Sequence, residues 1–320
     1  MKYVSQILFA LIALSLLAVA TILAAQHPVA HPDAALDDAQ VRAIVQRAIA
    51  MQHHSDATLD LYDRTERVID RDDEKTTETT FRTVPLGASN GRVALNRDGQ
   101  SVPKPEVAQR WQEILNVMES RTHTDDPAVK KEYERAARRK REAAKMVDAI
   151  AEAFDFRSAG RAVRAGRQVI VLDFQPNPAF KSKLRFSGVY KQIWGRVWVD
   201  EASGYVVRLE AELRRDIPIG GGIVGKIYQG SRVELEQAEA PPGAGVWLPT
   251  FTSYDIEFRK FVFPGSYRFY ATSTPSVRLP DTTPARRHMA IALRAWQSGR
   301  YRWERCFPRA RRAQRDAASR

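Results

Sequence analysis

The stretch IWGRVWVDEASGYVVRLEAELR runs from Ile193 to Arg214 and has the pattern of two extended strands around a short turn. In its second half, apolar side chains at Tyr205, Val207, Leu209, Ala211 and Leu213 alternate with Arg208, Glu210, Glu212 and Arg214. A period of two with one apolar and one charged side is typical of an antiparallel sheet with one buried face and one face in water. The stretch therefore predicts a β-hairpin within a larger sheet.

Similar segments lie on both sides of this hairpin. Further strands are expected at 58–70, 76–84, 92–96, 167–174, 189–200, 225–237, 247–260 and 267–273. Consecutive strands with short turns form an antiparallel meander. A helix is expected at 39–51, and a helical hairpin at 104–154 interrupts the strands, where the apolar spacing changes to 3.6 residues. We predict an α+β fold, a curved antiparallel β-sheet forming an unclosed β-barrel, with the helical hairpin insertion lidding it.

The two ends of the chain differ from its body. Residues 1–25 join a short cationic start to an uncharged apolar run, as in a Sec-type signal peptide; a retained inner-membrane anchor is the alternative. Residues 26–38 are expected to be a flexible arm. Residues 39–284 are expected to form a single β-rich domain, and residues 285–320 an Arg-rich, disordered tail. The predicted location is therefore periplasmic or otherwise extracytoplasmic.

The net charge of +12 is concentrated at the C-terminal end. Residues 285–320 contain eleven arginines against two acidic residues, a net +9, which leaves +3 for residues 1–284. A nearly neutral body argues against nucleic acid as a partner. The tail is either a basic arm for an anionic membrane surface, a solvated run of like charges, or a segment without a selected role. The basic residues between Lys130 and Lys145 are either a membrane-surface patch or a solvated helix face.

No catalytic, metal or cofactor motif is complete. Residues 220–226 match seven positions of a phosphate-binding loop, but Ile227 stands where Ser or Thr should bind magnesium, and a strand follows where a helix is needed. His27 and His31 are four residues apart but fall in the expected flexible arm, so no histidines form the helical i, i+4 pair of a zinc enzyme, and Cys306 has no catalytic pattern around it. We predict a protein without catalytic residues, metal or cofactor, although a pair of glycosidase-type carboxylates is not recognisable from sequence.

Aromatic residues are frequent in the C-terminal half of the chain. If the sheet curves, its concave side can form an apolar cleft of the kind that holds acyl chains. The candidate ligand-binding residues for this cleft are Trp194, Trp198, Tyr205, Tyr228 and Trp247. Core packing is the alternative role for each ring.

The hairpin of residues 195–208 resembles the central hairpin of bacterial outer-membrane lipoprotein-sorting proteins of the LolA/LolB type. The stretch 245–249 followed by a strand is similar to a later segment of that family, and residues 84–87 and 97–99 resemble a relative with a large insertion. The resemblance implies an unclosed antiparallel β-barrel whose helices cover a site for acyl chains, with no catalytic residues. The charged helical insertion and the Arg-rich tail depart from the family.

These observations favour a non-enzymatic periplasmic carrier for an apolar ligand, either lipid or lipoprotein acyl chains. The alternative is a structural or protein-interaction module of the cell envelope that holds no lipid. An extracytoplasmic hydrolase is the third hypothesis, without a motif to support it. An internal apolar cleft favours the carrier, and an exposed patch favours the interaction module.

Overall fold

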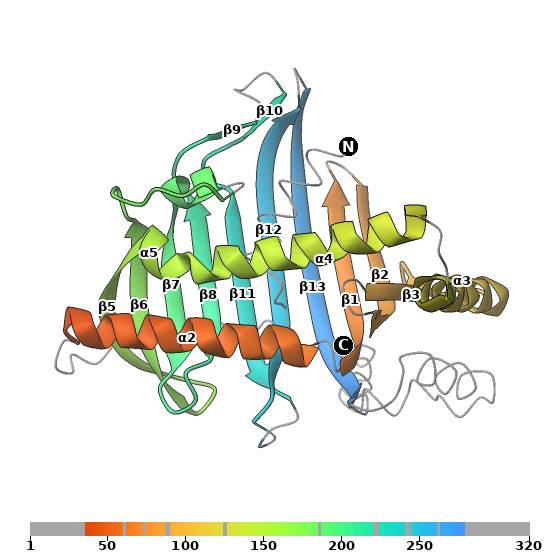
Figure 1. Cartoon of the computed structure of the whole chain (residues 1–320), viewed down its shortest axis with the longest axis horizontal. Coiled ribbons are helices and arrows are strands. Elements are labelled where there is room, and N and C mark those ends of the chain that lie inside the picture. Colours follow the sequence, from red (N-terminus) through yellow and green to blue (C-terminus); the bar gives the residue numbers. More distant parts are fainter. Residues whose placement is uncertain are drawn as a thin grey trace, which may run out of the picture.

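The computed structural model describes residues 36–59, 62–72, 75–86, 90–123, 127–184, 187–219, 224–240, 243, 245–260 and 263–278. The described strands form one 13-stranded antiparallel sheet in the order β4-β3-β2-β1-β13-β12-β11-β8-β7-β6-β5, and the short β9–β10 ribbon pairs with β12. This order has two ends, at β4 and β5, and those ends do not pair with each other. The sheet is therefore curved but unclosed, which confirms the predicted fold class (Figure 1).

The strands follow one another as a meander apart from one long return. Their bounds are β1 Tyr62–Asp72, β2 Lys75–Pro85, β3 Asn90–Arg97, β4 Gln100–Ser101, β5 Phe154–Arg164, β6 Arg167–Pro176, β7 Ile193–Asp200, β8 Val206–Leu213, β9 Ile217–Ile219, β10 Gly225–Ile227, β11 Arg232–Glu239, β12 Trp247–Lys260 and β13 Phe263–Arg278. The helices are α2 Asp38–Leu59, α3 Lys104–His123, α4 Pro127–Asp148 and α5 Ile150–Ala153, with a 3₁₀ turn, η1, at Ser187–Gln192. The long return is the helical connection from β4 at one end of the sheet to β5 at the other, and β13 pairs with β1 between them.

The predicted central hairpin is strands β7 and β8. Val197 lies opposite Leu209, so both side chains point to the same face of the sheet. In the turn, one Asp200 carboxylate oxygen accepts hydrogen bonds from the Ser203 backbone N–H at 2.7 Å and from the Ser203 hydroxyl at 2.6 Å. Gly204 then adopts a φ of 80°, a conformation that glycine reaches without steric cost. The turn is thus fixed by one side chain and one glycine.

One face of the sheet is covered by helices. The register aligns Leu172, Val197, Leu209 and Leu235 across four neighbouring strands, and α2 packs its Val41 and Val45 against this row. Figure 1 shows α2 and α4 both crossing in front of the strands on this side. We call it the helix-covered face. The opposite face carries the alternate residues, such as Trp194, Arg208 and Glu236.

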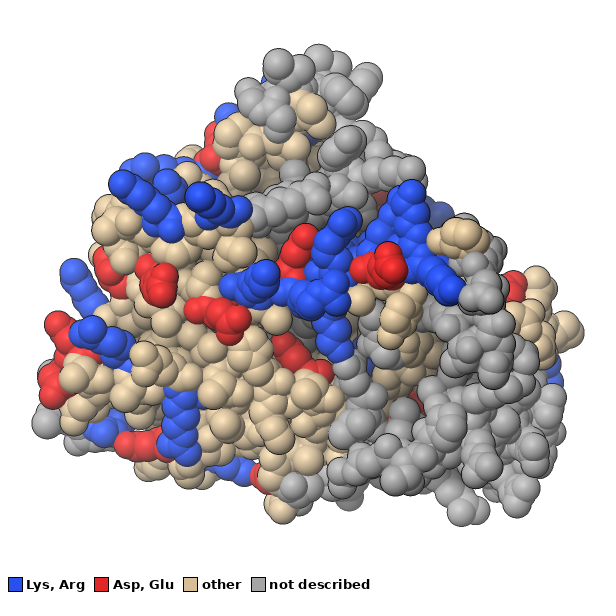
Figure 2. All heavy atoms as spheres, viewed as in Figure 1, with Lys and Arg blue, Asp and Glu red and all other residues tan. Residues whose placement is uncertain are grey.

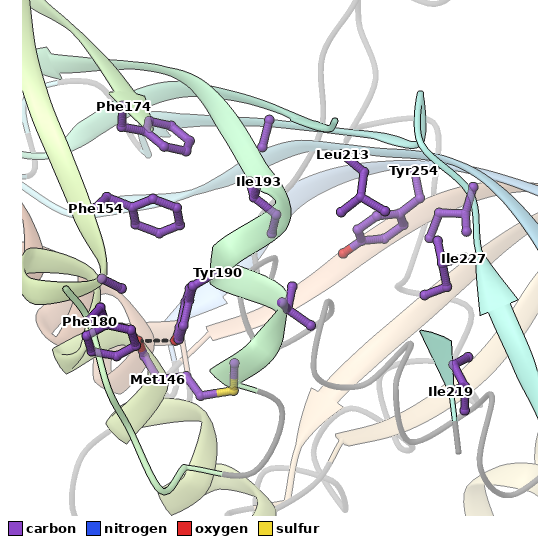
Figure 3. Close-up of a cluster of buried hydrophobic side chains, with 14 residues drawn as sticks. Met146, Phe154, Phe174, Phe180, Tyr190, Ile193, Leu213, Ile219, Ile227 and Tyr254 are labelled. Carbon is purple, nitrogen blue, oxygen red and sulfur yellow. Dashed lines mark hydrogen bonds between the residues drawn. The ribbon is translucent and has the colours of Figure 1, made fainter. Parts of the chain in front are cut away.

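The largest buried cluster lies under the junction of α4 and α5. Its central side chain is Tyr190, which is fully buried and whose hydroxyl donates a 2.7 Å hydrogen bond to the Met146 carbonyl (Figure 3). The ring of Phe154 meets Tyr190 edge to face at 5.5 Å, and Phe180 meets it at 5.8 Å. Aromatic edge-to-face contacts of this length add to the stabilisation from apolar burial. The cluster therefore fixes the end of α4 to the sheet.

The two arms of the helical insertion have different positions. Helix α4 crosses the helix-covered face, and its C-terminal residues Met146 and Val147 are buried. Helix α3 packs Val107, Trp111 and Ile114 against Val84 and Val93 at the β2–β3 end of the sheet. The apolar spacing that predicted both helices thus corresponds to two separate contacts with the sheet.

Several element boundaries differ from the sequence-based expectations. The first helix continues to Leu59 instead of ending at Met51, so the strand expected from residue 58 begins at Tyr62. Strand β5 was not predicted, because its Arg, Ser, Ala and Gly residues break the alternation of apolar side chains. The expected strand at 225–237 is two strands, because Gly230 adopts a φ of 85° in a turn between β10 and β11.

Some expectations lie outside the described residues. These are the signal or anchor at 1–25, most of the arm at 26–38, the tail at 285–320 with Cys306, and the glycines of the phosphate-loop look-alike. The flanks of that loop are described, and they are the antiparallel strands β9 and β10, with Gly225 opposite Ile219. A strand follows the glycines, as expected for a hairpin instead of a phosphate loop.

We predict that Gly195→Ala destabilises the fold. A methyl group at this position would overlap the Glu210 carbonyl oxygen and lie 2.5 Å from the Phe174 ring. Relieving such overlap costs at least about 2 kcal/mol in the free energy of unfolding. Chemical denaturation of Gly195→Ala and of Gly188→Ala measures this cost. Gly188 is the control because a methyl group there meets nothing within 4 Å; equal stability of the two variants would contradict the described packing.

Candidate functional site

An apolar cavity lies between α2 and the helix-covered face of the sheet. Its volume is about 110 Å³. The helices contribute Val45, Ala48, Ile49, Gln52, Asp56, Val147 and Ile150, and the sheet contributes Phe154, Phe156, Leu172, Phe174, Val197, Val199, Val206, Leu209 and Leu235. All of these are apolar except Gln52 and Asp56. Ligand sites are commonly lined by apolar side chains with a few polar groups, which is the composition found here.

The sequence of α2 explains why it covers the cavity. Val41, Val45 and Ala48 recur at intervals of four and three residues, and all three are buried. This spacing places them on one side of a helix, where they contact the apolar row of the sheet. At the start of α2, the backbone N–H of Gln40 donates a 2.8 Å hydrogen bond to the Asp37 carboxylate, and the Gln40 side chain accepts one from the Asp37 N–H. This reciprocal pair caps the helix.

Buried polar groups attach the C-terminal half of α2 to the sheet. The Ser55 hydroxyl, which is 2% exposed, lies 3.1 Å from the Gln237 side-chain oxygen and 3.0 Å from the Trp247 carbonyl oxygen. The Gln237 amide in turn donates a 2.9 Å bond to Gln52, and Gln52 donates a 2.8 Å bond to Asp56. A buried polar network that is satisfied restricts the geometry of its members. The network therefore fixes the position of the C-terminal half of α2 relative to strands β11 and β12.

Two exposed contacts hold α2 at other points. Arg47 donates a 2.6 Å hydrogen bond to the Ala202 carbonyl in the β7–β8 turn. His53 Nε2 lies 2.6 Å from Asp148 Oδ1, which joins α2 to the end of α4. Both contacts are at the surface, where single polar pairs contribute little to stability. The helix is thus held firmly by its buried residues and weakly by its exposed ones.

The cavity is small for a lipid. Pockets that bind drug-sized ligands have volumes of about 300–1,000 Å³, and an engineered cavity of about 150 Å³ holds one benzene molecule. At about 110 Å³, this cavity accommodates less than a benzene molecule. Binding of an acyl chain therefore requires α2, α4 or the lining side chains to move away from the sheet.

The five aromatic residues predicted to form the cleft do not line this cavity. Trp194 and Trp198 alternate with Ile193 and Val197 along β7 and so lie on the opposite face. An Arg214 guanidinium lies 5.6 Å from the Trp194 ring centre, and Arg208 lies 5.9 Å from that of Trp198. Strand parity therefore places these two rings on the face opposite the cavity, and their role in ligand binding stays a prediction.

The structure brings three of the five aromatic residues together. Trp198, Tyr205 and Trp247 belong to one buried cluster, in which Tyr205 and Trp247 stack at 5.3 Å with their planes 15° apart. The Arg167 guanidinium lies 4.8 Å from the Trp247 ring centre. Tyr228 stands apart from the cluster, after β10, where Lys226 Nζ lies 5.4 Å from its ring centre. These three clustered rings therefore pack in the core, and their role in ligand binding stays a prediction.

The opposite face has a larger but polar depression of about 540 Å³. Its lining includes Trp194, Arg196, Glu210, Glu212, Arg214 and Arg232. Arg196 makes a two-point contact with Asp173, at 2.5 and 3.0 Å, and Arg208 donates to Glu210 at 2.5 Å and to Glu234 at 3.0 Å. Opposite charges thus neutralise one another across the strands. The charged side chains around this depression pair with one another, whereas the smaller cavity presents apolar side chains. We therefore regard the smaller cavity as the candidate site.

A buried ionic cluster on β1, β2 and β3 was not anticipated from the sequence. Glu66 Oε1 lies 2.6 Å from Arg64 Nε, while Oε2 lies 2.8 Å from Arg92 Nη2 and 2.9 Å from the Thr83 hydroxyl. Burial alone would raise the pKa of the Glu66 carboxyl, but the two guanidinium groups and the hydroxyl hold it below its ordinary value. Both carboxylate oxygens are engaged, so the group acts as an anchor between three strands.

The described residues contain neither a candidate metal site nor a candidate membrane-spanning helix. Within the described ranges, no group of three or more His, Cys, Asp or Glu side chains is placed to hold a metal ion. No helix in the part of the chain that the structure describes is long and apolar enough to cross a membrane.

The true cavity residues were visible in the sequence only in part. The stripe of Val45, Ala48 and Ile49 predicted the buried side of the first helix. Leu172, Leu209 and Leu235 line the cavity as well, and the aromatic candidates lie elsewhere. Strand parity predicts which side of each strand is apolar, whereas the alignment of these residues in one row follows from the pairing of the strands.

Comparisons with known proteins give low similarity. No protein-family model matches the chain, and no curated protein matches it. Among solved structures, a DUF1329 family protein from Desulfovibrio piger is 12% identical, with 75% of this chain and 95% of that chain covered and a TM-score of 0.28. An outer membrane lipoprotein-sorting protein domain from Vibrio parahaemolyticus is 8% identical, with 77% and 99% covered and a TM-score of 0.26. MucB in complex with MucA(peri) is 8% identical, with 75% and 96% covered and a TM-score of 0.21.

A lipoprotein-sorting domain is thus among the structures to which this chain is similar, as the central hairpin indicates. At these TM-scores the similarity has no bearing on the ligand. The candidate site is defined by its own residues.

We predict that Ser55→Ala loosens the C-terminal half of α2. The change removes the one hydroxyl that lies within hydrogen-bond distance of both the Gln237 and the Trp247 oxygen, so a buried acceptor loses its donor, at a cost of about 1–3 kcal/mol in the free energy of unfolding. Hydrogen exchange should accelerate at the α2 amides around residue 55. Ser101→Ala, at an exposed position in β4, is the control. Unchanged exchange in Ser55→Ala would show that the network does not hold the helix.

We predict that Glu66 contributes stability that is lost in acid. Because the folded pKa is lower than the unfolded value of about 4.3, the contribution is complete above that value and disappears as the pH falls through the folded pKa. Glu66→Gln should therefore be destabilised near neutral pH, and its deficit relative to the original chain should shrink in acid. Denaturant unfolding as a function of pH measures this deficit. Glu132→Gln, at an exposed position on α4, should show no deficit at any pH.

Proposed function

We propose that this protein is a non-enzymatic carrier that binds an apolar chain, of a lipid or of a lipoprotein acyl group, between α2 and the sheet. The observation that supports the proposal is the apolar cavity. Its lining comes from helices α2, α4 and α5 and from five strands, and it includes only two polar side chains. Apolar ligands gain free energy by leaving water for such a lining. The full set of lining residues belongs to the described part of the chain.

The attachment of α2 supports a carrier that opens. The buried network around Ser55 holds the C-terminal half of the helix, whereas its first half is held by apolar contacts and by exposed contacts such as that of Arg47. Apolar contacts are non-directional, so a ligand chain can replace the α2 side chains against the sheet. We propose that α2 moves away from the sheet around its attached end when the ligand enters.

Export completes the proposal. A carrier of lipid or lipoprotein acyl chains in the cell envelope requires transfer out of the cytoplasm, for which residues 1–25 are the predicted signal or anchor. The proposed location is therefore periplasmic. The single-domain organisation of residues 39–284 remains part of the same proposal.

A second candidate function is an envelope module that binds a protein partner and no lipid. The depression of about 540 Å³ on the opposite face favours it, because Trp194 lies among charged residues there. Aromatic and Arg side chains are enriched where proteins bind one another. Native mass spectrometry of the protein isolated from its own envelope distinguishes the two. One lipid per chain supports the carrier, and a bound protein without lipid supports the module.

We predict that Ala48→Phe weakens binding of an apolar chain. Ala48 lines the cavity and is 8% exposed, so a phenyl group at this position occupies the space that the ligand needs. Fluorescence titration with cis-parinaric acid should show binding about tenfold weaker or more for this variant. Ala50→Phe is the matched control, with the same substitution on the exposed side of the same helix. Equal affinities in the two variants, or no binding by the original chain, would refute the proposed carrier.

A further inference from the structure

Helix α4 contains more net positive charge than the rest of the chain before residue 285. Between Pro127 and Asp148 there are eight Lys and Arg residues against four Asp and Glu residues, a net +4. The whole of residues 1–284 has a net charge of +3. The remainder of that part is therefore slightly negative overall.

The exposed cations of α4 include a row along one side of the helix. Lys131, Arg138 and Lys145 are seven residues apart, and Arg141 lies between the last two at intervals of three and four. These spacings place all four side chains on the same helical face. All four are exposed, whereas Ala136, Met146 and Val147 are buried on the other side. We call Lys131, Arg138, Arg141 and Lys145 the basic row.

The basic row is not neutralised by the rest of the described structure. Within the described ranges, Lys131, Arg141 and Lys145 form no ion pair, and Arg138 has only a 3.9 Å contact with Glu142. Arginines on the opposite face differ, since Arg196 and Arg208 are held by carboxylates at 2.5 Å. Paired charges cancel at a distance, whereas a row of cations without partners produces an attractive potential for anions. The basic row is therefore a stronger candidate for contact with an anionic partner than the paired arginines of the opposite face.

The row lies beside the helix that covers the candidate site. Figure 2 shows Lys and Arg side chains gathered along α4, on the face from which both α2 and α4 are seen in Figure 1. The C-terminal end of α4 also supplies Val147 to the cavity lining. From Lys131 to Lys145 the row extends about 21 Å along the helix axis. A straight row of this length suits a flat, extended anionic surface.

We infer that the basic row of α4 is a docking site for the anionic surface of a lipid bilayer. Cationic side chains within a Debye length of such a surface are attracted to acidic headgroups, each one increasing the affinity by about fivefold. The inference goes beyond the carrier function and does not depend on an occupied cavity. Its consequence for a carrier is that docking brings the helices that cover the cavity next to the lipid.

The test compares two fourfold variants of the full chain. One carries Lys131→Gln, Arg138→Gln, Arg141→Gln and Lys145→Gln. The control carries Arg71→Gln, Lys75→Gln, Lys104→Gln and Arg215→Gln, which removes four exposed cations from other elements. Both keep residues 1–25 and 285–320 and have the same net charge, so a difference between them isolates α4. Circular dichroism and thermal unfolding establish that both are folded.

The measurement is co-sedimentation with vesicles of phosphatidylcholine, with and without phosphatidylglycerol, over a range of salt concentrations. The original chain and the control should bind the phosphatidylglycerol vesicles, and more weakly as salt rises. The α4 variant should bind them about 600-fold more weakly, because four losses of about fivefold multiply. A Lys131→Arg and Lys145→Arg variant keeps the charge and should bind like the original chain.

Two results would overturn the inference. One is an α4 variant that binds as tightly as the control, which would assign binding to another part of the chain. The other is an original chain that binds both kinds of vesicle equally. The carrier function is tested separately in the absence of vesicles, where cis-parinaric acid should bind the α4 variant and the original chain equally, because the row lies outside the cavity lining.

Discussion

The packing of α2 against the helix-covered face is the contact on which the site depends. Val41 and Val45 lie on Ile170, Leu172, Val197 and Val199, and this contact covers apolar residues that the sheet would otherwise expose. Burial of apolar side chains provides most of the free energy that holds a helix to a sheet. The same contact creates the cavity, because the helix covers the row without filling all of the space beneath it.

Polar groups then determine where the helix can move. The buried hydrogen bonds of Ser55 and Gln237 are directional, so they fix one end of α2, and the apolar contacts along the rest of the helix are not directional. The cavity between this helix and the sheet has a volume of about 110 Å³. On the other face, the ion pairs of Arg196 and Arg208 link neighbouring strands.

The sequence predicted the sheet better than the site, for a physical reason. Alternation of apolar and charged residues from Tyr205 to Leu213 specifies both a strand and its buried side, so the antiparallel sheet and the hairpin at Gly204 were predicted correctly. Which strands lie beside each other is not encoded locally, so the pairing of β1 with β13 could not be predicted. Strand parity places Trp194 and Trp198 on the face opposite the cavity, and the cavity side of β7 has the smaller Val197 and Val199.

The central claim is that an apolar chain binds between α2 and the sheet. Photo-crosslinking with a diazirine-labelled fatty acid, followed by mass spectrometry of the peptides, tests it most directly. The account predicts labels on α2 around Ala48 and on the row of Leu172, Val197 and Leu209. Labels confined to the opposite face around Trp194, or no specific label, would contradict it.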